Sequence, residues 1–314
     1  MKIVFMGTPD FAIPSLEILL NNRYDIAAVV TAPDKPRGRG QQVSFTAVKE
    51  CALKHSLQIF QPDSLKGENF ISQISNLGPD LFVVVAFRIL PKEVFSIPTK
   101  GAFNLHASLL PQYRGAAPIN WAIINGEKES GVTTFFLQEK VDTGNILLQA
   151  RVAIGEATTA GELHDVLADV GAEIVLQTVR LIELGKANPR SQNETLASPA
   201  PKIFKDDCRI QWEKSSREIH NFIRGLSPYP TAWTTHEGKQ LKIYRSEIVT
   251  LRHQTIKPQK DFQPGKVTVD SSRLYTGTGD GAIEILQLQQ EGKKKMATAE
   301  FLRGYRFNAG AVFN

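Results

Sequence analysis

The sequence predicts an α/β protein with a doubly wound, mostly parallel sheet, followed by a smaller domain of short β-strands. Three observations support this. In the first half, short apolar runs alternate with segments of helical period. A stretch rich in Asn, Ser, Pro and Ala then interrupts the periodicity, as linkers do. Beyond it, the apolar runs are short and separated by glycine-containing turns. The length of 314 residues fits this organisation, at roughly 150 residues per domain.

The first half contains the strands and helices of the expected sheet. Five nearly continuous apolar runs are typical of parallel strands covered on both faces: Lys2–Met6, Asp25–Thr31, Leu57–Phe60, Asp80–Ala86 and Ala102–His106. Apolar residues at helical spacing lie between them in two segments: Phe11–Leu20 and Phe45–Leu53. Two further strands and a long helix follow: Val132–Leu137, Ile146–Ala153 and Ala160–Leu184. We expect this helix to begin after the cap candidates Thr158-Thr159 and to end at Gly185.

The second half of the sequence has short predicted strands and only one predicted helix. Ala187–Pro201 is the aperiodic stretch. The sequence therefore divides into an α/β domain at 1–188, a linker at 189–204 and a C-terminal domain at 205–314. The C-terminal part holds one predicted helix and four predicted strands: Ser215–Gly225, Thr231–Thr235, Leu241–Ser246, Lys266–Val269 and Ala282–Leu288. Short strands at this spacing predict a small barrel or sandwich.

Charge is unevenly distributed along the chain. Residues 205–314 hold 18 Lys or Arg against 12 Asp or Glu, a net of +6, whereas residues 1–204 hold 19 against 20. A basic C-terminal half indicates contact with a polyanion. A lysine-rich face that meets only water explains the charge equally well.

Several classes of protein are excluded by the motifs that the chain lacks. Cys51 and Cys208 form neither a disulfide framework nor a CxxC motif, and each is expected to be an inert, partly buried thiol. The absence of HExxH, GxSxG and GxxxxGK[ST] argues against a metal site, a serine hydrolase and a P-loop NTPase. There is no secretory signal pattern and no apolar run near the ~18 residues of a membrane span, so we expect a cytoplasmic protein.

Polar residues stand out in the strand Ala102–His106. Asn104 and His106 are two apart and share one face near the C-terminal end of the strand, where open α/β sheets bind ligands. An amide can donate to a developing oxyanion, and an imidazole with a pKa near ~6.5 can relay a proton at neutral pH. A lone strand histidine is more often a core residue, but the pair favours a catalytic site.

Three turns carry further candidates. Asp142, in Val141-Asp142-Thr143-Gly144, would orient His106 or hold a water, although an Asx turn explains it as well. The single glycine of the Gly7-Thr8-Pro9-Asp10 turn supports a dinucleotide site only weakly against a tight βα turn. Pro33–Gly40 is rich in Lys, Arg, Gly and Pro, so neither helix nor strand is expected there. This exposed basic loop would reach a nucleic-acid phosphate or simply be solvated.

At these residues the chain resembles the folate-dependent formyltransferases. The resemblance rests, in order along the chain, on MKIVFMGTPDFA, TAPDKPRGRG, VVVAFRILP, NLHASLLPQYRGAAPINWAI, VDTGNIL and GKKKMATAEFLRG. It covers nearly the whole chain. It implies a Rossmann-like catalytic domain followed by an OB-like β-barrel. It also implies formyl transfer from 10-formyltetrahydrofolate, a co-substrate, with no metal.

The resemblance also assigns roles to individual residues. Its catalytic set is Asn104, His106 and Asp142. Two segments would line the folate pocket: Phe87, Arg88, Ile89, Leu90, Ser108, Leu109, Leu110 and Pro111. Two basic groups would contact tRNA: Lys35, Arg37, Arg39, Lys293, Lys294 and Lys295. Arg88 departs from the family, which commonly has glycine there, and Gln41-Gln42 replaces a second basic pair.

The identity of the formyl acceptor follows from the remaining segments. Enzymes that formylate glycinamide ribonucleotide or amino sugars share the Asn-x-His and Asp-Thr-Gly segments. The PDKPRGRG loop and the separate basic domain favour the α-amino group of initiator methionyl-tRNA, with the chain acting as a monomer in translation initiation. The alternatives are a formyltransferase for an amino-sugar nucleotide and a non-catalytic RNA-binding protein. A dinucleotide oxidoreductase rests on sheet architecture alone.

Overall fold

The computed structural model describes residues 1–37, 42–249 and 263–314, and the chain folds into two compact units. Unit 1 comprises Met1–Ala116, Ser130–Val152 and His164–Ala200. Unit 2 comprises Ala117–Glu129, Ala153–Leu163 and Pro201–Asn314. The C-terminal unit therefore includes two short segments that belong, by sequence, to the first half of the chain.

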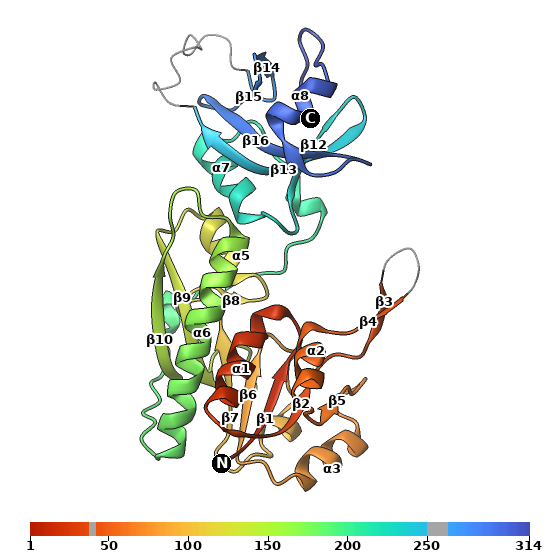
Figure 1. Ribbon diagram of the computed structural model, residues 1–314. Coiled ribbons are helices and arrows are strands. Elements are labelled where there is room, and N and C mark those ends of the chain that lie inside the picture. Colours follow the sequence, from red (N-terminus) through yellow and green to blue (C-terminus); the bar gives the residue numbers. More distant parts are fainter. Residues whose placement is uncertain (38–41, 250–262) are drawn as a thin grey trace. The chain divides into compact units, whose positions relative to one another are not determined.

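Unit 1 is built on a seven-stranded sheet in the order β10-β9-β7-β6-β1-β2-β5 (Figure 1). Its strands are β1 Lys2–Gly7, β2 Asp25–Val30, β5 Ile59–Phe60, β6 Leu81–Val85, β7 Ala102–His106, β9 Glu129–Phe136 and β10 Ile146–Ala153. Within this order, the neighbouring strands β7, β6, β1, β2 and β5 all pair in parallel. Strand β9 pairs with β7 in antiparallel orientation. The chain builds β2 and β5 on one side of β1 and then returns to build β6 and β7 on the other. Sheets of this kind bind ligands at the C-terminal strand ends beside such a reversal.

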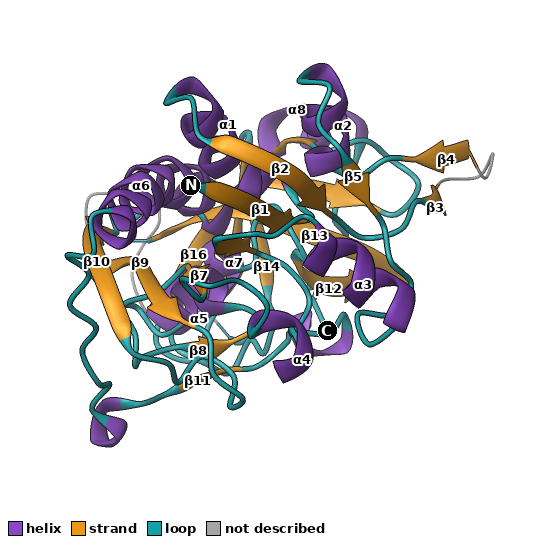
Figure 2. Ribbon diagram, turned by 90° about the horizontal axis from the view of Figure 1, so that it is seen from below, coloured by secondary structure: helices purple, strands orange, loops and turns teal. Residues whose placement is uncertain are grey.

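Helices cover both faces of this sheet. Figure 2 shows α1, α2 and α6 on one side and α3 and α4 on the other. Their bounds are α1 Ile13–Asn21, α2 Ala47–Lys54, α3 Glu68–Asn76, α4 Lys92–Phe95 and α6 Ala160–Glu183, with a 3-10 turn at Asp10–Ala12. On one face, Leu105 of β7 lies so close to Gly171 of α6 that a Cβ on the glycine would be 2.7 Å from the leucine. Alternation along β7 therefore directs Asn104 and His106 to the face of α3 and α4.

The predicted α/β architecture is confirmed. β7 and β10 have the predicted bounds, and the other parallel strands agree to within two residues. The long helix begins as expected, because the Thr159 hydroxyl accepts from the Glu162 N–H while the Glu162 carboxylate accepts from the Thr159 N–H at 2.8 Å. It ends at Glu183, one residue before the predicted Leu184, and Gly185 follows with a φ of +66°, which suits a residue without a side chain.

One expectation about unit 1 is wrong. Lys35–Arg37 forms a strand, β3, which pairs with β4 (Gln42–Ser44) in a two-stranded antiparallel ribbon. Pro36 lies opposite Val43 in this ribbon. Proline is tolerated there because both strands are edges, so a residue without an N–H costs no central ladder bond.

Unit 2 contains a six-stranded antiparallel sheet in the order β12-β13-β16-β15-β14, with β17 paired to β16. The strands are β12 Ala232–His236, β13 Lys239–Ile248, β14 Val267–Asp270, β15 Arg273–Gly277, β16 Ala282–Gln290 and β17 Met296–Ala297. Two helices, α7 (Ser216–Gly225) and α8 (Thr298–Gly304), contribute to a core with Trp212, Leu274 and Ile285. This confirms the expected second domain of short strands.

A helix from the first half of the sequence completes unit 2. α5 (Pro118–Ile124) packs on α7, and the Asn120 side chain donates to the Gly225 carbonyl at 2.8 Å. A Cβ on Gly225 would lie 2.7 Å from the Ile124 side chain, so the two helices approach closely at this glycine. Among the described residues, no helix combines the length and apolar character that a membrane span requires.

Candidate active site

Asn104 occupies the middle of β7, beside Val84 of β6 and Phe135 of β9. Its side chain is half-buried on the polar face of the strand. Within the described part of the chain, no protein group forms a hydrogen bond with its amide, so both the N–H and the carbonyl of that amide are available to a ligand. A half-buried amide without a partner is costly unless something else satisfies it.

His106 ends the same strand and is buried, with 6% of its surface exposed. Its Nε2 lies 2.8 Å from the carbonyl oxygen of Tyr113. A carbonyl only accepts, so Nε2 donates, and Nδ1 of the neutral ring carries the lone pair. Nδ1 in turn lies 3.8 Å from Oδ2 of Asp142. A proton arriving at Nδ1 would therefore create an imidazolium that faces a carboxylate.

Asp142 is held in a tight turn. Its Oδ2 accepts from the Gly115 N–H at 2.9 Å, and its backbone has a φ of +55°, in the left-handed region. Gly144 ends the turn, and a Cβ at this position would clash with the carbonyl oxygen of Phe136. The turn therefore holds the carboxylate beside His106, the residue that ends the strand carrying Asn104.

Gln192, which the sequence analysis did not single out, supports this turn. Its Nε2 donates to the carbonyl oxygens of Asp142 at 2.9 Å and of Gly144 at 2.8 Å. Its Oε1 accepts from Nη2 of Arg114 at 2.7 Å. Arg114 also forms an ion pair with Glu194 at 2.7 Å, which raises the pKa of the arginine and lowers the pKa of the glutamate. Residues of the expected linker 189–204 thus fasten the Asp142 turn.

The Ser-Leu-Leu-Pro segment is fastened from β9. Thr133 donates its hydroxyl to the Ser108 carbonyl at 2.7 Å and accepts from the Leu110 N–H at 3.1 Å. The Ser108 hydroxyl is itself buried and donates to the Gln112 carbonyl at 2.6 Å. Leu110 packs in a small core with Phe135. Leu109 and Pro111 are the half-buried members of the four predicted lining residues.

The second predicted lining segment follows β6. Phe87 is half-buried, Ile89 is 72% exposed, and Leu90 is buried in the core. Ala86 has a φ of +48°, in the left-handed region. Arg88 lies outside that region, so its backbone conformation does not require glycine. The Arg88 guanidinium donates to the backbone carbonyls of residues 62 and 63 at 2.7 and 3.0 Å. Its Nε–H is buried with no partner among the described residues.

The predicted basic contacts lie on both units. Lys35 is exposed on β3, Arg37 ends that strand, and Arg39 lies outside the described residues. Residues 293–295 are exposed between β16 and β17. Lys295 places its ammonium 4.8 Å from the centre of the Tyr244 ring, a cation–π arrangement.

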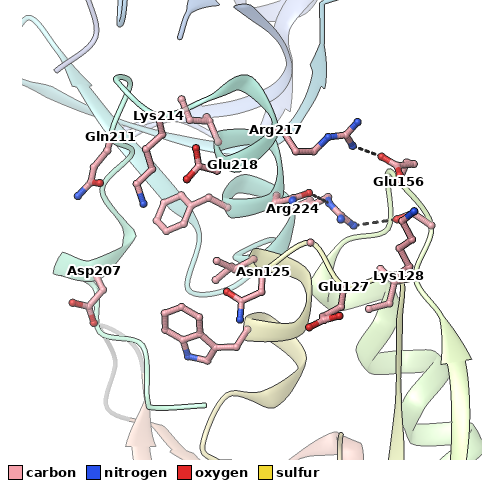
Figure 3. Close-up of a pocket in the computed structure, with 18 of the residues that line it drawn as sticks. Asn125, Glu127, Lys128, Glu156, Asp207, Gln211, Lys214, Arg217, Glu218 and Arg224 are labelled. Carbon is pink, nitrogen blue, oxygen red and sulfur yellow. Dashed lines mark hydrogen bonds and ion pairs between the residues drawn. The ribbon is translucent and has the colours of Figure 1, made fainter. Parts of the chain in front are cut away.

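Unit 2 also has a cavity of about 870 Å³, which holds none of the predicted site residues (Figure 3). Its apolar wall includes Trp121 and Phe222, and charged side chains surround it. Arg224 is buried and donates to the carbonyls of Gly155 and Thr158, each at 3.0 Å, and burial lowers its pKa. These bonds tie α7 to residues 153–163, so the arginine has a structural role.

One group of side chains among the described residues has donor atoms close enough to hold a metal ion: Glu17, Cys51 and His55. It lies on α1 and at the C-terminal end of α2, and it contains none of the three candidate catalytic residues.

Comparison with known proteins bears on the whole chain. Residues 1–179 match the formyl transferase family and residues 202–306 match the formyl transferase C-terminal domain. Methionyl-tRNA formyltransferase of Chlorobium limicola is 51% identical over 310 residues, covering 98% of this chain and 97% of the relative. The enzyme of the same name from Caldanaerobacter subterraneus is 46% identical, with 99% of each chain covered.

Solved structures share the fold at lower identity. An N-formyltransferase from Helicobacter canadensis, in complex with folinic acid and dTDP-3-aminofucose, superposes with a TM-score of 0.67 at 22% identity, over 94% of this chain and all of that one. Methionyl-tRNA formyltransferase from Clostridium thermocellum gives a TM-score of 0.56 at 16% identity, over 79% of this chain and 94% of that one. By its two family matches and its full-length relatives, the chain belongs to the formyl transferase family, among the methionyl-tRNA formyltransferases.

Proposed function

We propose that this chain transfers the formyl group of 10-formyltetrahydrofolate to the α-amino group of initiator methionyl-tRNA. The observation that carries the proposal is the arrangement of Asn104, His106 and Asp142 at the C-terminal end of β7. The available amide, the fixed imidazole tautomer and the facing carboxylate supply the three groups that acyl transfer to an amine requires.

The reaction begins with the neutral amine, which adds to the formyl carbon and forms the new C–N bond. The Asn104 amide N–H stabilises the oxyanion that develops on the formyl oxygen. His106 accepts the proton of the attacking nitrogen at Nδ1, and Asp142 stabilises the resulting imidazolium. The same proton then passes to the departing folate nitrogen as its C–N bond breaks. The histidine returns to its neutral form, so protons and electrons balance.

The two segments beside the sheet's ligand-binding edge are the proposed folate contacts. The Helicobacter relative with folinic acid supports a folate as the formyl donor. Phe87, Ile89, Leu109 and Pro111 present apolar surface, while Leu90, Ser108 and Leu110 are buried beneath them as support. The buried Nε–H of Arg88 would be satisfied by a polar atom of the folate or by water.

Transfer RNA is the proposed macromolecular substrate. Residues 205–314 carry a net charge of +6, and lysines 293–295 are exposed there, which suits contact with phosphates. Lys35, Arg37 and Arg39 of the β3–β4 region would contact the acceptor end. We propose that the chain works as a monomer in the cytoplasm, where translation is initiated.

The test is direct. The full chain is incubated with methionyl-tRNA and 10-formyltetrahydrofolate, and formyl-methionyl-tRNA is separated from methionyl-tRNA on an acid gel. A parallel reaction offers a UDP-amino sugar as the acceptor. Formylation of the tRNA alone is expected. A formylated product found only with the amino sugar would mean that the acceptor is the amino sugar and not the tRNA. No product with either acceptor would contradict the assignment of a catalytic site.

A variant links the activity to the site. Asn104→Ala should lower kcat by about 100- to 1000-fold, the usual cost of losing one oxyanion donor, with little change in KM. An unchanged kcat would remove Asn104 from the mechanism.

A further inference from the structure

Three metal-ligating side chains converge on the helical face of unit 1, away from the strand that carries the catalytic candidates. Glu17 lies on α1, Cys51 on α2, and His55 directly follows α2. One donor atom from each lies within 4.8 Å of the other two. The Cys51 sulfur is 3.9 Å from Oε1 of Glu17. A carboxylate, a thiol and an imidazole thus meet at one point, although the sequence motifs predict no metal site.

Their spacing fits a tetrahedral ion. Bonds of about 2.0–2.3 Å from zinc to oxygen, nitrogen and sulfur place neighbouring ligand atoms roughly 3.3–3.8 Å apart. The Glu17–Cys51 separation of 3.9 Å lies just above this range. The Cys51 side chain is buried, whereas the Glu17 and His55 side chains are exposed and have room to move closer to its sulfur. Cys51 and His55 are four residues apart, so the helix presents both on one face.

The local electrostatics also suit a cation. The Glu17 carboxylate faces the Cys51 sulfur, so an ion between them would have an anionic oxygen ligand already beside it. A divalent ion that displaces the thiol proton to solvent would neutralise the thiolate and the carboxylate together. Cys208, the other cysteine, is equally buried but faces a backbone carbonyl oxygen, that of Phe204, at 3.2 Å.

We propose that Glu17, Cys51 and His55 form a Zn²⁺ site with water in the fourth position. The donor set of one sulfur, one nitrogen and one oxygen is the borderline-soft mixture that zinc prefers. The ion would join α1 to α2, the helix that directly follows the β3–β4 ribbon. It would thereby brace the base of the ribbon that carries Lys35 and Arg37.

Cobalt substitution tests the proposal with two matched cysteines. The tag-free full chain is stripped with chelator and titrated with Co²⁺, and the near-ultraviolet sulfur-to-cobalt charge-transfer absorption is recorded. We expect this absorption in the wild type and in Cys208→Ser, and its loss in Cys51→Ser. No absorption in the wild type, its persistence in Cys51→Ser, or its loss in Cys208→Ser would each overturn the site.

Replacement of the buried Cys51 could impair folding, so the two exposed ligands, Glu17 and His55, are also replaced. Glu17→Gln and His55→Ala should each weaken Zn²⁺ binding by at least about tenfold, because even outer-shell changes cost that much. His164→Ala is the histidine control, since that ring lies beside Asp10 and Asp165 and no thiol. Zinc should raise the melting temperature of the wild type and of His164→Ala, and have a smaller effect on His55→Ala. Equal Zn²⁺ affinity in His55→Ala and wild type would refute the assignment.

Discussion

One buried histidine of unit 1 and one of unit 2 each place Nε2 against a backbone carbonyl, and the two differ in the group that faces Nδ1. His106 of unit 1 donates from Nε2 to the Tyr113 carbonyl, and its Nδ1 faces the carboxylate of Asp142 at 3.8 Å. His220 of unit 2 places Nε2 3.0 Å from the Glu156 carbonyl, and its Nδ1 lies 3.1 Å from the Ser246 hydroxyl. In both, the carbonyl selects the same tautomer of the neutral ring.

The partner at Nδ1 decides what each ring can do. A hydroxyl satisfies the lone pair of a neutral imidazole but gives an imidazolium little support, and burial lowers the pKa of His220. A carboxylate that lies beyond hydrogen-bond distance leaves Nδ1 able to accept a proton and then stabilises the charge. Burial and a fixed tautomer are therefore common to His106, the proposed catalytic histidine, and His220, and the group that faces Nδ1 distinguishes the two.

Exchange of each ring for an amide tests this comparison most strongly. His106→Gln should reduce kcat for formylation by about 100- to 10,000-fold, the usual contribution of a general base, because glutamine cannot carry the proton. His220→Gln should leave kcat unchanged. Both are measured as initial rates at saturating tRNA and folate. Similar losses in the two variants would mean that the carboxylate does not set the histidines apart.

The network behind Asp142 gives the next largest effect. Gln192→Ala removes both bonds that hold the backbone of the Asp142 turn, so the carboxylate should shift from Nδ1 of His106. We expect kcat to fall by up to about 100-fold, as a misplacement of roughly 1 Å can cost. Asn22→Ala, which removes an exposed hydrogen bond from Arg180 in the same unit, is the comparison variant. A kcat for Gln192→Ala no lower than that for Asn22→Ala would show that the turn is held by other contacts.

The sequence predicts the residues on β7 but not Gln192, which holds the Asp142 turn. Asn104 and His106 could be found because alternation on a buried strand places two polar side chains on one face. Gln192 could not, because it lies in an aperiodic stretch and its role depends on where that stretch docks. For the same reason, the four-residue spacing of Cys51 and His55 is visible in the sequence, but Glu17 joins them only through the packing of α1 on α2.

The β3–β4 ribbon shows a different limit. Glycine and proline in Pro33–Gly40 argue locally against regular structure, and that prediction fails at Lys35–Arg37. The strand exists because Gln42–Ser44 lies opposite as a pairing partner. Local propensity carries no information about a partner, so pairing overrides it.

The charge difference between the two halves predicts an effect on binding. Replacement of lysines 293, 294 and 295 by alanine removes three exposed cations from unit 2. The tRNA affinity should fall at low salt, and the log–log salt slope should decrease by up to about 3, roughly 1 per lost phosphate contact. Filter binding at several salt concentrations measures the slope, and kcat at saturating tRNA should not change. A slope equal to that of the wild type would place the phosphate contacts elsewhere.

The smallest effect concerns stability and returns to His220. Because burial lowers its pKa in the folded state, the unfolded chain takes up a proton below pH ~6.5 that the folded chain resists. The free energy of unfolding should therefore decrease as the pH falls through that region, by at most about 1.4 kcal/mol per pH unit from this one group. In His220→Gln the side chain can still donate to the Glu156 carbonyl, but this part of the pH dependence disappears. Urea unfolding followed by Trp fluorescence at pH ~5.5 and ~7.5 compares the two proteins. An equal loss of stability in both would mean that the ring of His220 takes up its proton as readily in the folded state as in the unfolded chain.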